Sequence, residues 1–287
     1  MSVRYCGREF TDDELDVLRH LCATKPTRRA IADAACDELG WVRIDGRRKD
    51  MSARVALLRM ERDGLFILPA PRTTNGNGRI TRRIEPGPEL ASAMPGSLDE
   101  LGPIELALVD TKATKARWRM LVSMHHYLGY NPVAGAQLRY LVESKSGTVA
   151  ALGFAASAWK CGPRDAHIGW DSATREARLH LVVGNSRFLI LPNVRVANLA
   201  STILSRVARR LPADFSRTYG YEPVLLETFV ETGRFTGASY RAANWLCVGQ
   251  TKGRGKLDQH HNHALAVKDV YLYPLHRSYR EILTTPT

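Results

Sequence analysis

The chain has 287 residues, 44% of them hydrophobic and 24% charged, which excludes a disordered or collagen-like protein and predicts one or two globular domains. It contains no apolar run that would span a membrane, no secretion signal at residues 1–10 and no CxxC spacing among its five cysteines, so we expect a cytoplasmic protein without a disulfide framework or zinc ribbon. The 41 Lys and Arg residues outnumber the 29 Asp and Glu residues, and the net charge of +12 makes nucleic acid the first partner to test.

Residues 8–84 are predicted to form a winged helix-turn-helix domain. The capping-box sequence Thr11–Glu14 begins a first helix, because the Thr hydroxyl and the Glu carboxylate can each accept a backbone N–H. A second helix is expected over residues 28–39, where Gly40 follows as the stop, and a third over 49–63. Three helices followed by a hairpin are typical of the winged helix.

The third helix and the wing carry the features that would contact DNA. The spacing of Met51, Val55 and Leu58, at times joined by Leu57, predicts an apolar stripe that faces the core, while arginines project elsewhere. A strand at 65–69 and a basic return at 79–83 would form the wing. Because nonspecific attraction to DNA requires clustered Lys and Arg, double-stranded DNA is the expected partner, and a solvated charged face is the alternative. The expected DNA contacts, which include a basic loop at residues 251–256, are Arg47, Arg48, Lys49, Arg54, Arg82, Arg83, Lys252, Arg254 and Lys256.

Two further segments follow this domain. Residues 85–104 are rich in proline and glycine, which argues against a helix or a central strand and predicts a linker. From 105 to 287, strand and helix patterns alternate, so we expect an α+β domain with a mixed, mostly antiparallel sheet. The predicted strands cover residues 138–142, 147–154, 179–183, 187–191, 224–230 and 246–249, and the predicted helices cover 115–127, 198–211 and 237–244.

Two ionisable residues of this domain are candidates for proton transfer. The imidazole of His126 titrates near neutral pH, and a structural histidine at a helix end is the alternative. Glu227 is a lone carboxylate in an apolar strand, where burial would raise its pKa or demand a partner. A structural ion pair of Glu227 with Arg187 or Arg241 fits the sequence as well as catalysis does.

Several common classes of enzyme have no support in the sequence. The histidines at 260, 261 and 263 lack the spacing of a helical zinc pair, so no metal site is predicted. Residues 251–256 lack Walker spacing, so this loop is not a P-loop. GxSxG, HExxH and a GxGxxG after a first strand are all absent, which removes the usual hydrolase, metalloprotease and dehydrogenase assignments.

Six ordered motifs give the chain a family resemblance. They lie at residues 46–52, 126–129, 164–170, 185–192, 226–230 and 240–245. Together they resemble the DruA family, whose members occur in Druantia anti-phage systems and beside or fused to transposases. The resemblance implies a DNA-binding component of an anti-phage defence system.

A second, more distant resemblance concerns the chemistry. Residues 185–192, 198–201 and 240–244, with 248–251, are similar to the core of Mom-type DNA-modifying proteins, which are related to N-acetyltransferases of the GNAT fold. It implies a GNAT-like domain at 105–287 that modifies a DNA base. Acetyltransferases bind the CoA pyrophosphate at a glycine-containing turn, and residues 196–200 contain no glycine, which argues against acetyl-CoA and leaves the cofactor unknown.

On this enzyme hypothesis, the base leaves the duplex and is held by aromatic side chains of the second domain. The residues expected in catalysis are His126, Tyr127, Glu227, Tyr240 and Asn244. The residues expected around the base are Asp165, Trp170, Asn185, Arg187, Ser201 and Trp245. The alternative hypothesis is an inactive recognition or assembly platform for a helicase, nuclease or transposase partner, and a transcriptional regulator is the third. The sequence leaves open whether the protein is an enzyme.

Overall fold

The computed structural model describes residues 2–44, 46–72, 93–94, 96–133, 135–253 and 265–286. The chain divides into two compact units, Met1–Arg83 and Ile84–Thr287. The basic return expected at residues 79–83, with Arg82 and Arg83, lies outside the described residues, as do Arg254, Lys256 and the histidines at 260–263.

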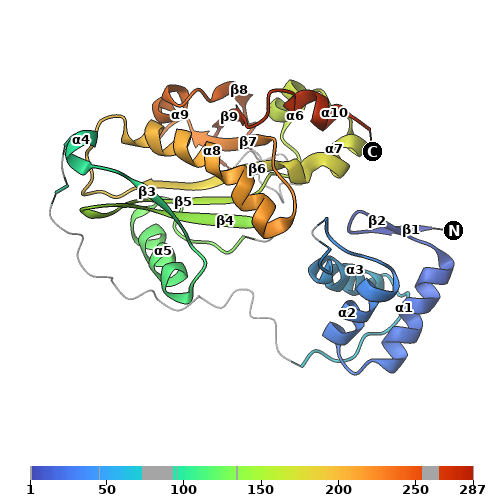
Figure 1. Ribbon diagram of the computed structural model, residues 1–287. Coiled ribbons are helices and arrows are strands. Elements are labelled where there is room, and N and C mark those ends of the chain that lie inside the picture. The colour runs from blue at the N-terminus through green and yellow to red at the C-terminus, as the bar shows by residue number, and fades with distance from the viewer. Residues whose placement is uncertain are drawn as a thin grey trace. The chain divides into compact units, whose positions relative to one another are not determined.

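The N-terminal unit consists of a short hairpin and three helices. Strands β1 (Val3–Tyr5) and β2 (Arg8–Phe10) pair antiparallel, and they precede α1 (Asp12–Thr24), α2 (Arg28–Glu38) and α3 (Asp50–Arg62), as Figure 1 shows. The capping box predicted at Thr11 is present, and the Thr27 hydroxyl accepts the N–H of Ala30 at the start of α2. These local signals therefore begin both helices where the sequence predicted.

Helix α3 presents a different face to the core from the one predicted. Met51, Val55 and Leu58 were expected inside, but their side chains are exposed, with 57% of Met51 accessible to solvent. The buried residues of this helix are Ala53, Ala56, Leu57 and Met60. The helix carries two apolar stripes, and the one that contains alanines lets α3 approach α2 closely.

Residues 65–69, predicted as a strand of the wing, form no strand. The N–H of Leu65 bonds to the carbonyl of Met60, and the N–H of Leu68 bonds to the carboxylate of Glu61 at 2.9 Å. Arg28 Nε donates to the carbonyl of Pro69 at 2.6 Å. These bonds hold the segment against the helices in place of a partner strand, so within the described residues this unit is a three-helix unit with an N-terminal hairpin.

The second unit contains a seven-stranded mixed sheet in the order β3-β4-β5-β6-β7-β9-β8. All neighbouring strands are antiparallel except β6 and β7, which confirms the α+β class and the mostly antiparallel sheet. The strands are β3 (Glu105–Leu108), β4 (Gln137–Ser144), β5 (Gly147–Ala156), β6 (Val182–Ile190), β7 (Leu225–Glu231), β8 (Leu246–Gln250) and β9 (Lys268–Pro274).

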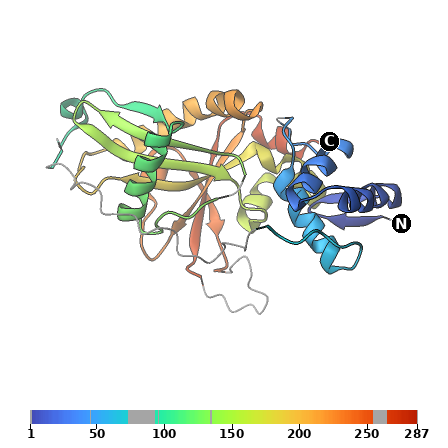
Figure 2. The ribbon, with the colours of Figure 1, turned by 90° about the horizontal axis from the view of Figure 1, so that it is seen from below.

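Helices cover both faces of this sheet. Figure 1 shows α8 (Leu199–Tyr219) on one face and α5 (Lys112–His125) on the other, and Figure 2 shows α5 in front of the strands. The remaining helical segments are α4 (Leu98–Leu101), α6 (Gly162–Ile168), α7 (Ser172–Arg178), the 3-10 turn Leu179–Leu181, α9 (Ala238–Ala242) and α10 (Tyr279–Thr284). Ile203, Val207 and Leu211 of α8 belong to the core that includes the buried strands. Among the described helices, none has both the length and the apolar character that a membrane crossing needs.

The segment expected to be a linker contains the short helix α4. Ser97 and Glu100 form a capping box, and the helix ends at Gly102, which has a positive φ of 73°. Leu101 is fully buried in the core of the second unit. A single capped turn fits before Pro103, so this part of the segment belongs to the folded unit and does not act as a linker.

The parallel pair at the centre of the sheet separates after three residues. β6 and β7 pair only over Val182–Gly184 and Leu225–Glu227. Beyond these residues β6 continues beside β5, while β7 continues beside β9. The two strands therefore diverge, and a pocket opens between them.

Candidate functional site

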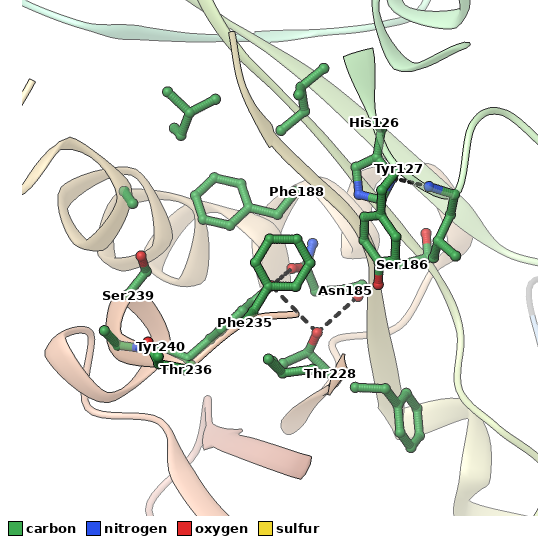
Figure 3. Close-up of a pocket in the computed structure, with 18 of the residues that line it drawn as sticks. His126, Tyr127, Asn185, Ser186, Phe188, Thr228, Phe235, Thr236, Ser239 and Tyr240 are labelled. Atoms are coloured by element: carbon green, nitrogen blue, oxygen red, sulfur yellow. Dashed lines mark hydrogen bonds between the residues drawn. The ribbon is translucent and has the colours of Figure 1, made fainter. Parts of the chain in front are cut away.

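A cavity of about 420 Å³ lies where β6 and β7 diverge, and we call it the main pocket. Its walls come from the end of α5, the divergent halves of β6 and β7, the first turn of α8, and the segment that leads into α9 (Figure 3). The lining residues are His125, His126, Tyr127, Leu128, Asn185, Ser186, Phe188, Leu189, Ile190, Ala200, Thr228, Phe229, Val230, Phe235, Thr236, Gly237, Ala238, Ser239 and Tyr240. No Asp, Glu, Lys or Arg side chain occurs among these described residues, so the lining is aromatic, aliphatic and neutral polar.

Aromatic rings form much of the wall. Tyr127 stacks on His126 with the ring centroids 4.9 Å apart, and it meets the edge of Phe235 at 5.2 Å. Phe188 meets Tyr240 edge to face at 6.2 Å. Flat apolar walls with a few polar groups between them suit a planar ligand with polar edges.

A hydrogen-bond network fixes the inner end of the pocket. The hydroxyl of Tyr240 donates to Asn185 Oδ1 at 2.7 Å, and the Thr228 hydroxyl donates to the backbone carbonyl of Asn185 at 3.1 Å. The Asn185 amide nitrogen donates in turn to the carbonyl of Gly153. Burial raises the pKa of Tyr240 above its ordinary value, so this hydroxyl stays protonated and acts as a donor.

His126 occupies the C-terminal cap of α5 and is held in one tautomer. Its Nδ1 accepts the backbone N–H of Leu128 at 3.2 Å, so in the neutral ring the proton is on Nε2. Burial, with a smaller effect from the charge of Arg187, lowers the pKa of His126 to about 4. Near neutral pH this side chain is therefore a hydrogen-bond donor through Nε2 and lacks a free lone pair for general-base chemistry.

Glu227 lies outside the main pocket, in a buried ion pair with Arg164. Arg164 Nη1 is 2.8 Å from Glu227 Oε2, and neither side chain is accessible to solvent. The N–H of Ala158 donates to the other carboxylate oxygen at 2.7 Å. Burial raises the pKa of Glu227, while Arg164 and this N–H oppose the rise. The ion-pair alternative named Arg187 or Arg241 as the partner, and the partner is Arg164 instead. Both oxygens of the Glu227 carboxylate are occupied by these contacts.

Asp165 and Trp170 belong to the same buried cluster. Asp165 accepts two bonds from Arg164 and one from Trp170 Nε1 at 3.1 Å. The Arg164 guanidinium also lies 5.5 Å from the Trp170 ring centroid. Burial lowers the pKa of Arg164, but the charges of Glu227 and Asp165 outweigh this and raise it. Asp165 and Trp170, which were expected around the base, therefore do not line the main pocket, and both side chains contact this ion-pair cluster.

Of the other predicted site residues, some line or adjoin the main pocket and some do not. Arg187 lies beside the main pocket and donates to the carbonyl of Gly129 at 2.9 Å. Ser201 donates to the carbonyl of Asn198, and neither Asn244 nor Trp245 lines the pocket. The indole of Trp245 is buried against Tyr240, and its N–H has no partner among the described residues. Of the predicted set, the structure brings together His126, Tyr127, Asn185 and Tyr240.

The sequence did not single out three residues of the wall and one of the buried cluster. Phe188 and Thr228 lie within the motifs at 185–192 and 226–230, where alternation along a half-buried strand could have indicated them. Phe235 lies in a turn after β7, and no sequence pattern points to it. Arg164 was part of a quoted motif, but its fully buried position follows only from the fold.

The predicted DNA contacts of the N-terminal unit are partly engaged with acidic neighbours. Arg48 forms a two-pronged ion pair with Asp37 at 2.5 and 2.6 Å, and Arg54 pairs with Asp50 at 2.7 Å. Arg47 and Lys49 are exposed. DNA binding by these residues, and by Lys252 of the second unit, stays a prediction.

Comparisons with known proteins give similar solved structures and a matching family. The chain is similar to an N-acetyltransferase from Staphylococcus aureus Mu50, with 11% identity over 61% of this chain and 99% of that chain and a TM-score of 0.37. It is also similar to the ribosomal-protein-S18-alanine N-acetyltransferase from Escherichia coli, with 8% identity over 60% and 94% of the two chains and a TM-score of 0.39. A third is FeeM, an N-acyl amino acid synthase from uncultured soil microbes, with 9% identity over 63% and 94% and a TM-score of 0.38.

No curated protein matches the sequence. The family described as Druantia protein DruA matches residues 60–263, which include most of the second unit and every element of the main pocket. The match supports a role as a component of an anti-phage defence system. The chain belongs to the DruA family.

Proposed function

We propose that this DruA-family protein holds a nucleobase of DNA in the main pocket and transfers a small group to it as part of anti-phage defence. The observation that carries this proposal is the pocket itself, which combines aromatic walls with neutral hydrogen-bonding groups at the divergence of β6 and β7. A nucleobase is flat, uncharged and polar only at its edges, so it matches both properties of the lining. The net charge of +12 supports a polyanionic substrate.

His126 has a defined part in this reaction. Its Nε2–H can donate to the carbonyl oxygen of an activated acyl group and stabilise the oxyanion that forms when an exocyclic amine attacks. A bond forms between the amine nitrogen and the acyl carbon, the bond to the leaving group breaks, and the amine releases its proton to water. Water takes the proton in this scheme because no described carboxylate lines the pocket.

The first turn of α8 supports an anionic donor. Ala200 lines the main pocket, and Asn198, the residue before the helix, adopts the left-handed conformation with φ 61°. Asn accepts this conformation more readily than other residues with side chains, so it can make the turn that glycine makes in acetyltransferases. The side chain of Asn198 does not cap the helix, so backbone N–H groups of Ala200 and Ser201 remain to bind a phosphate of an acyl-CoA. The bound thioester would supply the acyl group.

One observation favours a second function, recognition of the base without transfer. The carboxylate of Glu227 is occupied by Arg164, and His126 Nδ1 is occupied by the N–H of Leu128. Among the described residues the pocket therefore holds no free general base. A recognition platform for a helicase, nuclease or transposase would bind base and DNA but leave the DNA chemically unchanged.

Nucleoside mass spectrometry distinguishes the two functions. DNA is isolated from cells that express the protein with the neighbouring genes of its native locus, and from cells with His126→Ala. His167→Ala is the matched control, because His167 contacts Tyr279 and Arg280 away from the main pocket. A base adduct present with the parent and His167→Ala but absent with His126→Ala supports transfer. Unmodified DNA in all three, with the protein folded, supports recognition alone.

A further inference from the structure

Two arginines lie on either side of one glycine in the middle of the sheet. Arg139 of β4 and Arg187 of β6 are both directly opposite Gly153 of β5. Side chains at directly opposed positions project from the same face of a sheet, so the two guanidinium groups extend over the same surface. Gly153 has no side chain that would fill the space between them.

The charges of these two arginines are not balanced by acidic groups. Arg139 donates to the side-chain oxygen of Gln137 at 2.6 Å and lies 4.9 Å from the ring centroid of Trp118. Arg187 donates to the backbone carbonyls of Gly129 and Ser186. In the part of the chain that the structure describes, neither forms an ion pair. Burial lowers the pKa of Arg187, which is the effect of a charge held without a counter-ion.

A narrow space, which we call the arginine cavity, is lined by Arg139, Arg187, Gly153, Trp118 and Ser186 among others. Its volume of about 10 Å³ accommodates one water-sized atom, which is also the size of one phosphate oxygen. A Cβ atom at Gly153 would lie 3.0 Å from Trp118 Cζ2 and 3.4 Å from Ser186 Oγ. The space therefore depends on the glycine.

The arginine cavity adjoins the main pocket through Ser186. The pairing of β5 with β6 shifts between Gly153 and Phe154, so Ser186 is the extra residue of a β-bulge. Ser186 lines both cavities, while its neighbours separate: Asn185 lines the main pocket and Arg187 lines the arginine cavity. Figure 3 shows Ser186 on the side of the main pocket where His126 and Tyr127 lie. The main pocket and the arginine cavity therefore share the wall residue Ser186.

We propose that Arg139 and Arg187 bind a phosphate of the nucleotide whose base occupies the main pocket, with one phosphate oxygen in the arginine cavity. The identity of the base rests on the proposed function, whereas the phosphate contact requires no transfer reaction. Two guanidinium groups supply the charge-assisted N–H donors that a phosphodiester accepts. The site would position an extruded nucleotide by its backbone while the pocket reads its base.

The test is binding of a short single-stranded oligodeoxynucleotide to the full-length protein, measured by fluorescence anisotropy at several salt concentrations. Arg139→Gln and Arg187→Gln should each weaken binding by about tenfold or more, since each removes hydrogen bonds to a charged group. Each should also reduce the slope of log K against log salt by about 0.7. Arg187→Lys keeps the charge and should preserve the slope. Arg139→Gln breaks no hydrogen bond to another segment and removes only the contacts of the guanidinium with the rings of Trp118 and Tyr130. It therefore tests the site even if Arg187→Gln disturbs the loop at Gly129.

Arg117→Gln is the matched control. Arg117 belongs to α5, is half exposed and pairs with Glu143, so its loss removes the same charge from the protein surface. Binding should change by less than about twofold, because an exposed, screened charge contributes little. Equal effects of Arg117→Gln and Arg139→Gln would overturn the proposal in favour of nonspecific attraction, as would absence of binding by the parent protein.

Two further ligands show whether the bound phosphate belongs to DNA or to the group donor. One is an oligonucleotide with a single abasic position, and the other is coenzyme A. Binding of the abasic oligonucleotide should depend on Arg139 and Arg187 as strongly as binding of the intact one. If only coenzyme A shows this dependence, the phosphate belongs to the group donor and the nucleotide site is wrong. Arginine-dependent binding without any base adduct in the mass spectra would contradict the proposed transfer and leave the phosphate site supported.

Discussion

Arg164 and Glu227 form an ion pair 2.8 Å long with both side chains fully buried, although 63 residues separate them in the sequence. Arg164 ties the start of α6 to β7, because it also donates to the carbonyl of Ala158 and to Asp165. Each oxygen of Glu227 accepts a hydrogen bond. Such a pair is costly to break from one side, since the remaining charge stays buried without a partner.

Glu227→Gln should therefore destabilise the second unit by about 3 kcal/mol. Arg164 would lose its charged partner, while the volume of the side chain stays nearly the same. Urea unfolding followed by circular dichroism measures the change. Glu231→Gln is the control on the same strand: its pair with Arg234 is partly exposed and 3.7 Å long, so the loss should be less than about 1 kcal/mol. A Glu227→Gln protein of unchanged stability that modifies no DNA would instead show that Glu227 is catalytic.

The pKa of His126 predicts a specific pH dependence of stability. Its value of about 4 in the folded protein is below the ordinary 6.5, so as the pH falls through this window the unfolded chain takes up a proton first. Stability is therefore lost as the pH falls from about 6.5 to about 4, and His126 makes no further change above that window. His126→Gln keeps an N–H donor but does not titrate, so it should flatten the free energy of unfolding over this range.

The measurement for His126 is urea unfolding of the parent and His126→Gln at several pH values. Proton NMR of the parent protein provides an independent check on the imidazole. An imidazole of His126 that titrates near 6.5 would be inconsistent with the burial and with the bond from Leu128. With His126 neutral in this range, we expect transfer activity to show no inflection near pH 6.5. An inflection at that pH would accompany an imidazole that titrates there.

Local signals were predictable from the sequence, and relationships between distant residues were not. The capping box at Thr11 needs only four neighbouring residues, and it starts α1 as predicted. The strand β9 was missed even though it is paired on both sides. Its residues 270–273 are all apolar or aromatic, so they lack the alternation of polar and apolar residues that indicates a half-buried strand. The partner of Glu227 depends on how α6 meets β7, so the sequence offered the nearer motifs of Arg187 and Arg241 instead.

The residues of the main pocket were also predictable only in part. His126, Tyr127, Asn185 and Tyr240 were predicted as site residues from motifs, and the structure places all four on its lining. Asp165 and Trp170 lie in an equally distinctive motif, but their side chains face the buried cation Arg164. A polar motif in the sequence indicates that a residue is constrained, and the packing of its strand or helix against the rest of the fold decides whether it faces a ligand or the core.

Tyr240→Phe should lower stability by about 1–3 kcal/mol and reduce binding of a base. The substitution leaves Oδ1 of the buried Asn185 without the hydroxyl that donates to it at 2.7 Å. Tyr127→Phe is the matched control on the opposite wall, because the Tyr127 hydroxyl forms no hydrogen bond within the described chain, and its stability should change by less than about 0.5 kcal/mol. Thermal unfolding of the two variants compares them, and equal losses would contradict the network at Asn185.

Leu57→Ala and Leu58→Ala test the orientation of α3 with two neighbouring residues of the same type. Leu57 is 3% exposed and Leu58 is 46% exposed, so the first truncation leaves a cavity and the second does not. Leu57→Ala should cost about 2–5 kcal/mol, and Leu58→Ala less than about 1 kcal/mol. Hydrogen exchange of the α1–α3 amides, read by mass spectrometry, reports the opening free energy of this unit separately from the sheet. A larger effect of Leu58→Ala would return Met51, Val55 and Leu58 to the core and would restore the predicted face of the helix.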